Sequence, residues 1–591
     1  MSEAAESLTS RLAGLNPFSK GAKHEDSNDD KGEEITANTV AGGGHGARQS
    51  GITKNQLRVS HALKSFLVEN NVMSKRDAGL SDGDETTPAL RDLLDKPHIN
   101  VPAYLTDRSY PLPEYFISSS HNTYLMAHQL FGESSSEAYK IVLGAGARCV
   151  EIDAWDNDEN VDEPKVTHGY TLVSHISFRS VCEVMRDAFD KEVAEAVPEQ
   201  GRRAAPILLS LENHCNPSGQ LRLVQIMKEV WGDRLLSKAV REEGHREEQD
   251  TGEHVTLEEL GAKIGVIVEH HIPGIIEDNE DDSDHDEFED ETEEQRKAQK
   301  AYKDKKKAAP VTIIIPELAA LGVYAQSVKP TDNSWYEQQA LTNGPDHHLI
   351  NISESKLLAV MPGASTKIAR HNAHHLMRVF PKGTRISSAN LDPVRFWGVG
   401  AHICALNWQT FGASMQINEA LFSGSDGYVL KPEALRAGGS GKLSDGRKKS
   451  LRLHIAGATE VPCPEKLDAD DIKPYVTCML VHPDDLEKAL PKRKTKPYHQ
   501  HKLGFLHKHD NPPPTDPIWD ETLEWEFEDN EMAFLRILIK SDESFATNPV
   551  LCVAAVRIMY ITSGWSFIRM LDLKGRETKC SLLVKFDVVN V

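Results

Sequence analysis

The pattern of hydrophobic and polar positions changes several times along the chain. Residues 1–50 are rich in Ser, Gly, Asp and Asn, so we expect a disordered tail there. From 51 to 108 apolar residues recur at helical spacing, as at Leu63 and Leu67, which predicts a small helical region. The segment SDGDETTPALRD has neither Gly at its sixth position nor Glu at its twelfth, as a complete calcium-binding loop requires. We therefore expect this region to be metal-free.

From Pro111 onward, short apolar runs alternate with helical stretches, which predicts a mainly parallel sheet covered by helices. The predicted strands are YFISS, RCVEIDAW, PILLSLEN, KIGVIVEH, VTIIIPEL, HICALNW and GYVLKP. Ser134 and Glu137 have the spacing of a capping box, which predicts a helix from Ala138 to Ala147.

Two charged blocks interrupt this series. Residues 277–294 hold thirteen carboxylates, and residues 296–307 hold seven Lys or Arg. Such blocks are solvated and mostly disordered. The strand pattern resumes at Val311, so we expect a linker at 274–310 that is inserted into one domain, between halves at 109–273 and 311–437.

The last part of the chain, residues 447–591, has a different texture. Apolar and polar residues alternate in runs such as LRLHIAG and LEWEFE. Alternation of this kind predicts half-buried strands, and the number of such runs favours an antiparallel β-sandwich.

Composition narrows the class of protein. A chain of 591 residues is long enough for several domains, and its net charge of −23 would repel nucleic acid, so we expect no nucleic-acid partner. No run reaches the roughly 18 apolar residues of a membrane-spanning helix, and no secretory signal opens the sequence. Eight scattered cysteines without a C-x-x-C pair suit a reducing compartment. We therefore expect a cytoplasmic protein whose membrane contact is peripheral.

Polar residues gather where four of the predicted strands end. They are His121 and Asn122 in SSSHNTY, Glu151 and Asp153 in VEIDAW, His168 in THGYT, and Glu212 in LLSLENH. Strand alternation places Glu151 and Asp153 on one face. Three carboxylates and an amide oxygen favour Ca²⁺ or Mg²⁺ over zinc, and two histidines beside them suit phosphoryl chemistry. Any one of these residues alone is more often an ordinary surface residue, so the prediction of a metal-dependent phosphodiesterase depends on the set.

The segments read together resemble a known family. PLPEYFISSSHNTYLMAHQLFGESSSEAY, GARCVEIDAWD, THGYT and PILLSLENHC resemble the first catalytic half of eukaryotic phosphoinositide-specific phospholipase C. The stretch from HHLMRVFPKG to GYVLKP resembles its second half, and IKPYV and PIWDETLEWEF resemble its C2 domain. The resemblance implies an α/β fold with a split (β/α)₈ TIM-like barrel, then an all-β C2-type sandwich, behind a short, degenerate EF-hand-like helical region.

The resemblance also implies a reaction. The enzyme would hydrolyse phosphatidylinositol or its phosphates to diacylglycerol and inositol phosphate, through an inositol 1,2-cyclic phosphate, in lipid signalling. The catalytic residues would be His121, His168, Glu151 and Glu212. The ligands of one Ca²⁺ would be Asn122, Glu151, Asp153 and Glu212.

The headgroup pocket departs from the family pattern. Arg378 is kept, but Asn351 stands at the ring-binding Ser and Phe380 at the stacking Tyr. The strand that should end in lysines reads KIGVIVEHHIP and ends near Glu269. A carboxylate there would repel a ring phosphate. We therefore expect phosphatidylinositol or its monophosphate to be cleaved as well as, or better than, the bisphosphate.

Membrane approach depends on an apolar rim in this family. The matching positions, with one addition, are Leu130, Phe131, Tyr170, Leu172 and Leu358. In the C2-like part, Lys473 and Lys540 stand where a calcium-binding C2 domain has Asp, so a scaffold role is favoured. The motif HNAHH at 371–375 has zinc-ligand residue types, but it precedes an apparent helix inside the second half of the barrel, and we expect no zinc there.

Two other functions stay open at this point. A glycerophosphodiester phosphodiesterase would attack with water and form no cyclic phosphate, although SSSHNTY and the second half argue against it. A catalytically silent lipid-binding scaffold would need to lose only one catalytic residue, and none is missing. The sequence does not identify an upstream activator, the oligomeric state, or an autoinhibitory role for the acidic linker.

Overall fold

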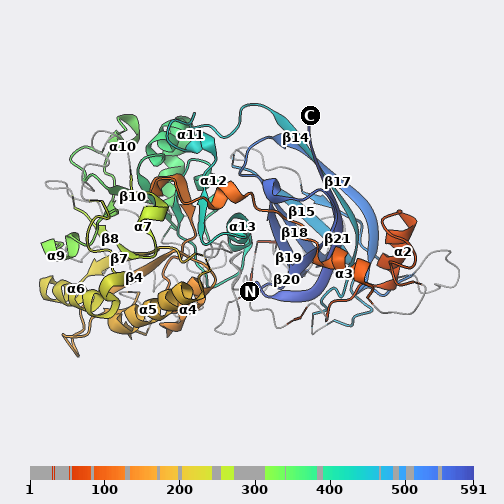
Figure 1. Ribbon diagram of the computed structural model, residues 1–591, viewed down its shortest axis with the longest axis horizontal. Coiled ribbons are helices and arrows are strands. Elements are labelled where there is room, and N and C mark those ends of the chain that lie inside the picture. The colour runs from red at the N-terminus through yellow and green to blue at the C-terminus, as the bar shows by residue number, and fades with distance from the viewer. Residues whose placement is uncertain are drawn as a thin grey trace, which may run out of the picture.

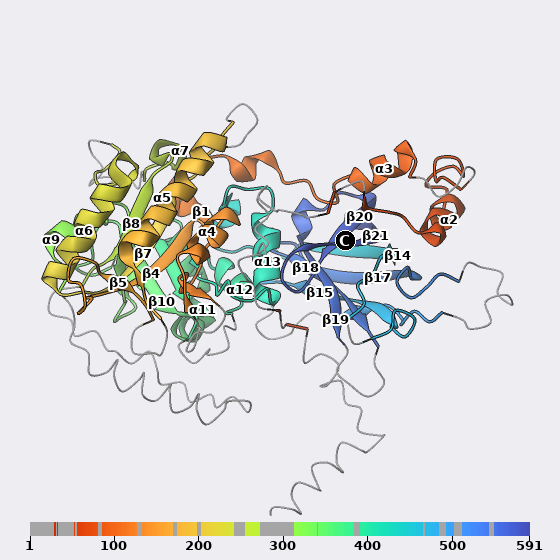
Figure 2. The same ribbon diagram turned by 90° about the horizontal axis from the view of Figure 1, so that it is seen from below.

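The computed structural model describes most of the chain. The described residues are 29–30, 32–33, 52–53, 56–80, 86–126, 133–168, 174–197, 203–241, 254–271, 313–339, 341–382, 390–464, 467–483, 492–500, 511–542 and 549–591. The predicted linker at 274–310 and most of the predicted tail lie outside them. A barrel of strands and helices lies beside a smaller β-domain, as Figures 1 and 2 show.

The barrel contains eight parallel strands among the described residues. In spatial order they are β1 (Tyr115–Ile117), β12 (Ile403–Cys404), β11 (Leu376–Phe380), β10 (His348–Ser353), β9 (Gln326–Val328), β8 (Ile264–Glu269), β7 (Ile207–His214) and β4 (Cys149–Trp155). A parallel bridge between Ser119 and Cys149 joins the two ends of this series and closes the ring. The predicted parallel sheet and TIM-like barrel are therefore confirmed.

Shorter strands extend the barrel sheet at its edges. Strand β13 (Tyr428–Leu430) pairs antiparallel with β1, and β5 (Lys165–Val166) and β6 (Ile176–Ser177) continue from β4. A separate hairpin joins β2 (Leu125–Met126) and β3 (Glu133–Ser134). The antiparallel β5 matters for function, because it places the segment after Val166 beside the end of β4.

Helices cover the outside of the barrel strands (Figure 2). They are α4 (Glu137–Gly144), α5 (Phe178–Glu195), α6 (Pro217–Trp231), α7 (Leu257–Leu260), α9 (Pro316–Ala319), α10 (Ser334–Glu337), α11 (Glu354–Asn372), α12 (Pro393–Trp397) and α13 (Ala413–Phe422). Helix α6 shows why such a segment folds locally. Asn216 caps its first turn, proline occupies the first helical position, and Leu223 and Met227 are buried one turn apart.

Two local predictions are wrong. The run VTIIIPEL forms no strand over its described residues, because Pro316 begins α9 and the next strand is β9. Proline is favoured at a helix start and lacks the N–H that a central strand needs. Helix α4 begins at Glu137 with no side-chain cap, and the hydroxyl of Ser134 donates to the Ser174 carbonyl oxygen at 2.6 Å instead of capping the helix.

The β-domain is entirely antiparallel over its described residues, as predicted. In spatial order its strands are β16 (Arg493–Lys494), β15 (Pro474–Val481), β18 (Phe534–Ser541), β19 (Val550–Arg557), β20 (Gly564–Leu571), β21 (Glu577–Asn590), β14 (Lys448–Thr459) and β17 (Ile518–Glu528). The alternation along β17 is strict, with Leu523, Trp525 and Phe527 buried and the residues between them exposed. This alternation forms one side of the apolar core of the domain.

The N-terminal helices α2 (His61–Glu69) and α3 (Pro88–Asp95) pack on the β-domain (Figure 2). Leu63 and Leu90 form a small apolar cluster with Phe567 of β20. Farther toward the N-terminus, buried Asp29 forms an ion pair with Lys540, which is itself 1% exposed. Lys540 stands where we expected a calcium-binding C2 domain to have Asp. Its charge is used in this internal ion pair.

None of the helices in the described part of the chain combines the length and the apolar character that a membrane crossing requires.

The barrel and the β-domain contact each other through α13. The side chain of Arg536 on β18 donates to Gln416 at 3.1 Å, and the Tyr560 hydroxyl donates to the Leu421 carbonyl oxygen at 2.9 Å.

Candidate active site

The predicted carboxylates meet at the carboxyl ends of β4 and β7. The two strands are paired in parallel with Asp153 directly opposite Glu212. Residues opposite each other on neighbouring strands share a face and lie about 5 Å apart. Carboxylate oxygens of Asp153 and Glu212 and a ring nitrogen of His214 all lie within 4.8 Å of one another. Two carboxylates at this separation repel each other unless a cation lies between them.

The effect of this repulsion is clearest at Asp153. Its Oδ2 accepts a hydrogen bond from the Tyr124 hydroxyl at 2.7 Å, whereas its Oδ1 is buried and accepts none from the described residues. Burial, followed by the charges of Glu212 and Glu151, raises the pKa of Asp153 well above its usual range. A buried carboxylate oxygen without a donor is unfavourable, and a bound cation would satisfy it.

Asn122 and Glu151 are held by the backbone just after β1. Asn122 has a φ of 45°, a left-handed conformation that asparagine tolerates better than most residues. In this conformation its backbone N–H donates to Glu151 Oε2 at 2.7 Å, and its side-chain oxygen lies 3.2 Å from the Tyr124 hydroxyl. The amide oxygen of Asn122 and the carboxylate of Asp153 therefore share the Tyr124 hydroxyl as a common neighbour.

Carboxylates outnumber guanidinium groups among the described side chains of this cluster. The Arg378 guanidinium donates to Glu151 Oε1, and both side chains are 2% exposed. Burial alone would lower the pKa of Arg378, but Glu151 and Glu212 outweigh it and raise the pKa. With Asp153 included, three carboxylates face one guanidinium. A divalent cation would be attracted to this group of carboxylates.

One predicted histidine, His121, lies beside the carboxylates, and the other, His168, comes from a segment next to β4. His121 Nδ1 lies 2.9 Å from Asn407 Oδ1, and its Nε2 lies 4.0 Å from Glu151 Oε2. An amide oxygen accepts only, so His121 carries its proton on Nδ1 when it is neutral. His168 follows β5 by two residues and is half-buried, and the adjacent Thr167 N–H points to the Asp153 carbonyl oxygen at 3.4 Å. Both imidazoles thus come from segments that border β4.

The residues predicted to read the headgroup come from β10 and β11. Asn351 and Arg378 are register partners, and the Arg378 guanidinium donates to Asn351 Oδ1 at 3.1 Å. The guanidinium carbon also lies 5.7 Å from the centre of the Phe380 ring, which is close enough for a cation–π contact. Arg378 is thus held by Glu151 and Asn351 inside the barrel. A direct contact with substrate phosphates stays a prediction.

Glu269 ends β8 beside this region. Its Oε2 lies 3.4 Å from the Asn213 N–H, and burial raises the pKa of its carboxyl group. The positive charge of Lys329, directly after β9, acts in the opposite direction on that pKa. The sequence showed that β8 does not end in the expected lysines. It did not show that Lys329, after the neighbouring strand β9, lies close to Glu269.

Most of the predicted rim lies outside the described residues: Leu130, Phe131, Tyr170 and Leu172. The exception, Leu358, lies in the second turn of α11, where it is half-buried against the barrel core. Its predicted contact with lipid remains a prediction.

Sequence reasoning missed three residues that shape the site. They are Tyr124, Asn407 and His214, whose ring stacks on Trp155 with centres 4.0 Å apart. Asn407 and His214 both lie at or beyond the carboxyl end of a barrel strand, in segments already recognised as strands. The rule that polar residues at such ends gather in a barrel could have identified them.

Comparison with known proteins agrees with the fold. Residues 108–270 match the X domain of phosphatidylinositol-specific phospholipase C, and residues 318–434 match its Y domain. The crystal structure of PLC21 from S. officinalis superposes with a TM-score of 0.66 at 23% identity, covering all of this chain and 68% of that one. This likeness shows a shared fold.

Curated relatives extend the similarity beyond the barrel. The 1-phosphatidylinositol 4,5-bisphosphate phosphodiesterase delta-3 of Mus musculus is 32% identical over 505 residues, 82% of this chain and 58% of the relative. The delta-1 enzyme of Rattus norvegicus is 29% identical over 82% of this chain and 61% of its own length. The 1-phosphatidylinositol 4,5-bisphosphate phosphodiesterase of Dictyostelium discoideum is 29% identical over 84% of this chain and 61% of its own.

Fold and site together define a closed (β/α)₈ barrel that carries an acidic, histidine-flanked centre and is joined to an antiparallel β-domain. The chain belongs to the eukaryotic phosphoinositide-specific phospholipase C family. It spans about 60% of the length of the curated relatives that it matches.

Proposed function

We propose that the chain is a calcium-dependent phosphoinositide phospholipase C. The observation that carries the proposal is the buried Asp153 Oδ1, which accepts no hydrogen bond from the described residues within a cluster that has an excess of negative charge. The family membership and the names of the relatives, which are phosphodiesterases of a phosphatidylinositol bisphosphate, support the same reaction.

The donor atoms at this centre suit calcium. Asn122, Glu151, Asp153 and Glu212 would hold the ion, and all four offer oxygen, which is the ligand that hard divalent cations prefer. Their carboxylates also supply the negative charge that one divalent ion would neutralise. When bound, Ca²⁺ would make the inositol 2-hydroxyl more acidic and stabilise negative charge on the phosphoryl oxygens.

The protein's own groups would divide the reaction into two steps. In the first, the inositol 2-hydroxyl attacks the phosphorus while Glu151 or Glu212 takes its proton, and His121 stabilises the charged phosphorane. His168 gives a proton to the departing diacylglycerol oxygen, so the phosphodiester bond breaks and a 1,2-cyclic phosphate forms. In the second, water adds to the phosphorus and the cyclic ester opens to inositol phosphate.

The same proposal assigns a domain to each part of the chain. Residues 109–273 and 311–437 would form the two halves of the barrel around a linker at 274–310, and 447–591 would form a C2-type domain. Residues 51–108 would correspond to a degenerate EF-hand-like region. The protein would work at the cytoplasmic surface of a membrane, on phosphatidylinositol lipids, with the apolar rim touching the bilayer.

Product analysis tests this function. The full chain is incubated with mixed vesicles that contain phosphatidylinositol or its bisphosphate, with Ca²⁺ and with a chelator. We expect Ca²⁺-dependent diacylglycerol together with inositol phosphate, part of it cyclic. Cleavage of added glycerophosphoinositol, with no diacylglycerol released from the vesicles and no cyclic phosphate, would favour a glycerophosphodiesterase instead.

Matched variants separate catalysis from folding. His121→Ala should lose about 10²- to 10⁴-fold in kcat, as removal of a proton-transfer or charge-stabilising group typically does, and should still bind vesicles. His61→Ala, on α2 and far from the barrel strands, should keep full activity. Vesicle binding without any diacylglycerol from the wild-type chain would support the silent scaffold.

A further inference from the structure

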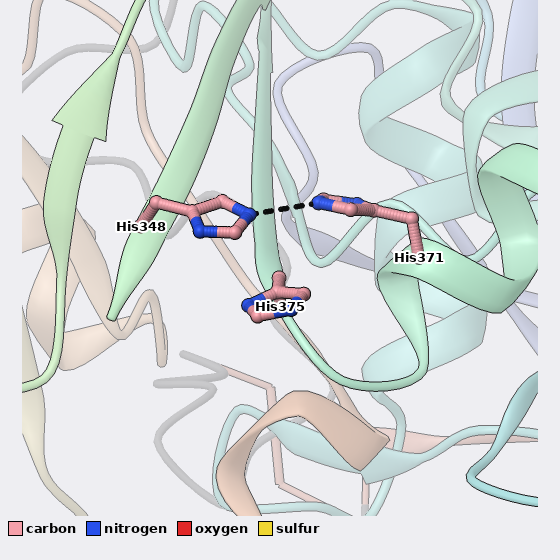
Figure 3. Close-up of side chains that lie close together, drawn as sticks. All are labelled: His348, His371 and His375. Carbon is pink, nitrogen blue, oxygen red and sulfur yellow. Dashed lines mark hydrogen bonds between the residues drawn. The ribbon is translucent and has the colours of Figure 1, made fainter. Parts of the chain in front are cut away.

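Three histidines form a cluster at the opposite end of the barrel strands from the carboxylates. His348 is the first residue of β10, His371 lies in the last turn of α11, and His375 directly precedes β11 (Figure 3). The headgroup candidates Asn351 and Arg378 lie three residues farther along the same two strands. Because side chains alternate along a strand, His348 and His375 point to the helix side, away from the barrel interior.

The rings lie very close together. His348 and His371 point toward each other with their Nε2 atoms 2.9 Å apart, and His375 lies beneath them (Figure 3). The ring of His375 is stacked on that of His348 with centres 4.0 Å apart. One ring nitrogen from each of the three residues lies within 4.8 Å of the other two.

The hydrogen-bond partners fix the protonation of two rings. His348 Nδ1 lies 3.2 Å from the Pro345 carbonyl oxygen, which can only accept, so Nδ1 of His348 carries a proton. His371 Nδ1 lies 3.1 Å from Asn372 Oδ1. The amide orientation of Asn372 is set because its Nδ2 donates to the Val399 carbonyl oxygen at 2.9 Å. Nδ1 of His371 therefore carries a proton as well.

Two neutral rings protonated on Nδ1 leave two lone pairs on Nε2. At a separation of 2.9 Å these lone pairs repel each other unless a cation lies between them. A single proton could join these two nitrogens, but it would leave the nearby ring nitrogen of His375 outside the interaction. A metal ion satisfies both nitrogens and also accepts the third, from His375.

We propose that His348, His371 and His375 form a structural site for Zn²⁺ or a similar first-row transition metal. Three imidazoles without a carboxylate in the group suit zinc and exclude Ca²⁺ or Mg²⁺ as the preferred ion. Zn–N bonds of 2.0–2.1 Å place tetrahedral ligand atoms about 3.4 Å apart, so small ring rotations would complete the geometry. The fourth position is left to water.

The surroundings have the features of a metal site. Both Nδ1–H groups donate to oxygens, which is the arrangement that orients a histidine ligand and raises its basicity. The buried Trp335 ring stands edge-on to His371 with centres 5.0 Å apart. The ion would join β10, α11 and the start of β11, and would therefore brace the second half of the barrel.

Sequence spacing alone argued against this site. Of the three proposed ligands, only His371 and His375 belong to the HNAHH motif. Two histidines four residues apart are weak evidence for a metal site. The third ligand, His348, comes from a different element and reaches the pair only through the fold.

The test measures metal binding directly and is independent of catalysis. The full chain, prepared without a histidine tag, is stripped with a chelator and titrated with Co²⁺, whose visible absorption reports tetrahedral coordination by nitrogen. Zinc content is then measured by mass spectrometry after re-loading. We expect one equivalent of metal with a tetrahedral spectrum, and a thermal midpoint that rises with zinc concentration.

Variants assign the metal to these residues. His348→Asn with His371→Asn should lose that one equivalent and the cobalt spectrum. The loss of affinity should exceed the roughly 10- to 100-fold that removal of an outer-shell partner costs. His374→Asn, an exposed histidine in the same turn, should keep both.

Two results would overturn the proposal. One is a wild-type chain that takes up neither cobalt nor zinc at micromolar free metal, which needs no variant and so does not depend on how the variants fold. The other is a double variant that retains the equivalent of the wild type.

Discussion

Arg378 and Glu151 form a buried ion pair between two strands whose residues are 227 positions apart in the sequence. Arg378 belongs to the part that matches the Y domain and Glu151 to the part that matches the X domain. The pair therefore joins the two matched parts of the barrel, which residues 271–317 separate in the sequence. It also compensates one of three carboxylates at the proposed calcium centre.

Arg378→Met should destabilise the barrel strongly. It leaves Glu151 buried and uncompensated, and breaking one side of a buried pair typically costs about 3–5 kcal/mol. Urea unfolding followed by tryptophan fluorescence measures the loss. The double variant Arg378→Met with Glu151→Gln removes both charges and should recover most of the stability, although not the activity. A double variant as unstable as the single one would show that the charge pairing is not the cause.

Asn407 should act as a positioning residue for His121. Its side-chain oxygen lies 2.9 Å from His121 Nδ1 and fixes which nitrogen carries the proton. Asn407→Ala should lower kcat by less than the 10²- to 10⁴-fold expected for His121→Ala, with KM nearly unchanged. Asn407→Asp keeps an acceptor at the same place and should recover part of kcat. Equal kcat in wild type and Asn407→Ala would contradict this role.

Much of the fold could be predicted because its cause is local. The alternation along LEWEFE and along VEIDAW fixes the faces of β17 and β4 without knowledge of their neighbours. The error at VTIIIPEL has an equally local cause, because Pro316 begins a helix. Strands β9, β10 and β11 were missed as separate elements, since their apolar runs are short and interrupted by Asn351 or Arg378.

The site was predictable to the extent that its residues lie inside long motifs. His121, Asn122, Glu151 and Asp153 were found in this way, and the structure brings them together. What the sequence could not supply was the pairing between elements. The ion pair of Arg378 with Glu151 and the contact of His348 with His371 each join two distant segments. Neither can be predicted from one segment alone.

Asp153→Asn should remove calcium stabilisation. A ligand that binds only the folded state stabilises it by RT ln(1 + [L]/Kd), about 2.7 kcal/mol at a hundredfold excess over Kd. We expect the thermal midpoint of the wild type to rise with Ca²⁺ and that of Asp153→Asn to stay nearly constant. Glu163→Gln changes a surface carboxylate and should respond to Ca²⁺ as the wild type does. A wild-type midpoint insensitive to millimolar Ca²⁺ would argue against the ion at this centre.

Glu269 should make headgroup choice depend on pH. Burial raises the pKa of this carboxyl group, so it gains a proton at a pH above the usual value of about 4.5. As the pH falls toward that window, the negative charge is lost and its repulsion of ring phosphates weakens. Turnover of the bisphosphate relative to phosphatidylinositol should therefore rise as the pH falls toward the raised pKa of Glu269.

The comparison with Glu269→Gln isolates this effect from other titrating groups. The variant is neutral at every pH, so its bisphosphate ratio at about pH 7 should already exceed that of the wild type and should change less on acidification. Lys329→Gln removes the positive charge that opposes Glu269 and should shift the wild-type ratio the other way, toward phosphatidylinositol. Initial rates on matched vesicles at saturating Ca²⁺ give both ratios. Parallel pH profiles for wild type and Glu269→Gln would mean that this carboxylate does not face the headgroup, and the preference would then have to arise from Asn351 and Phe380.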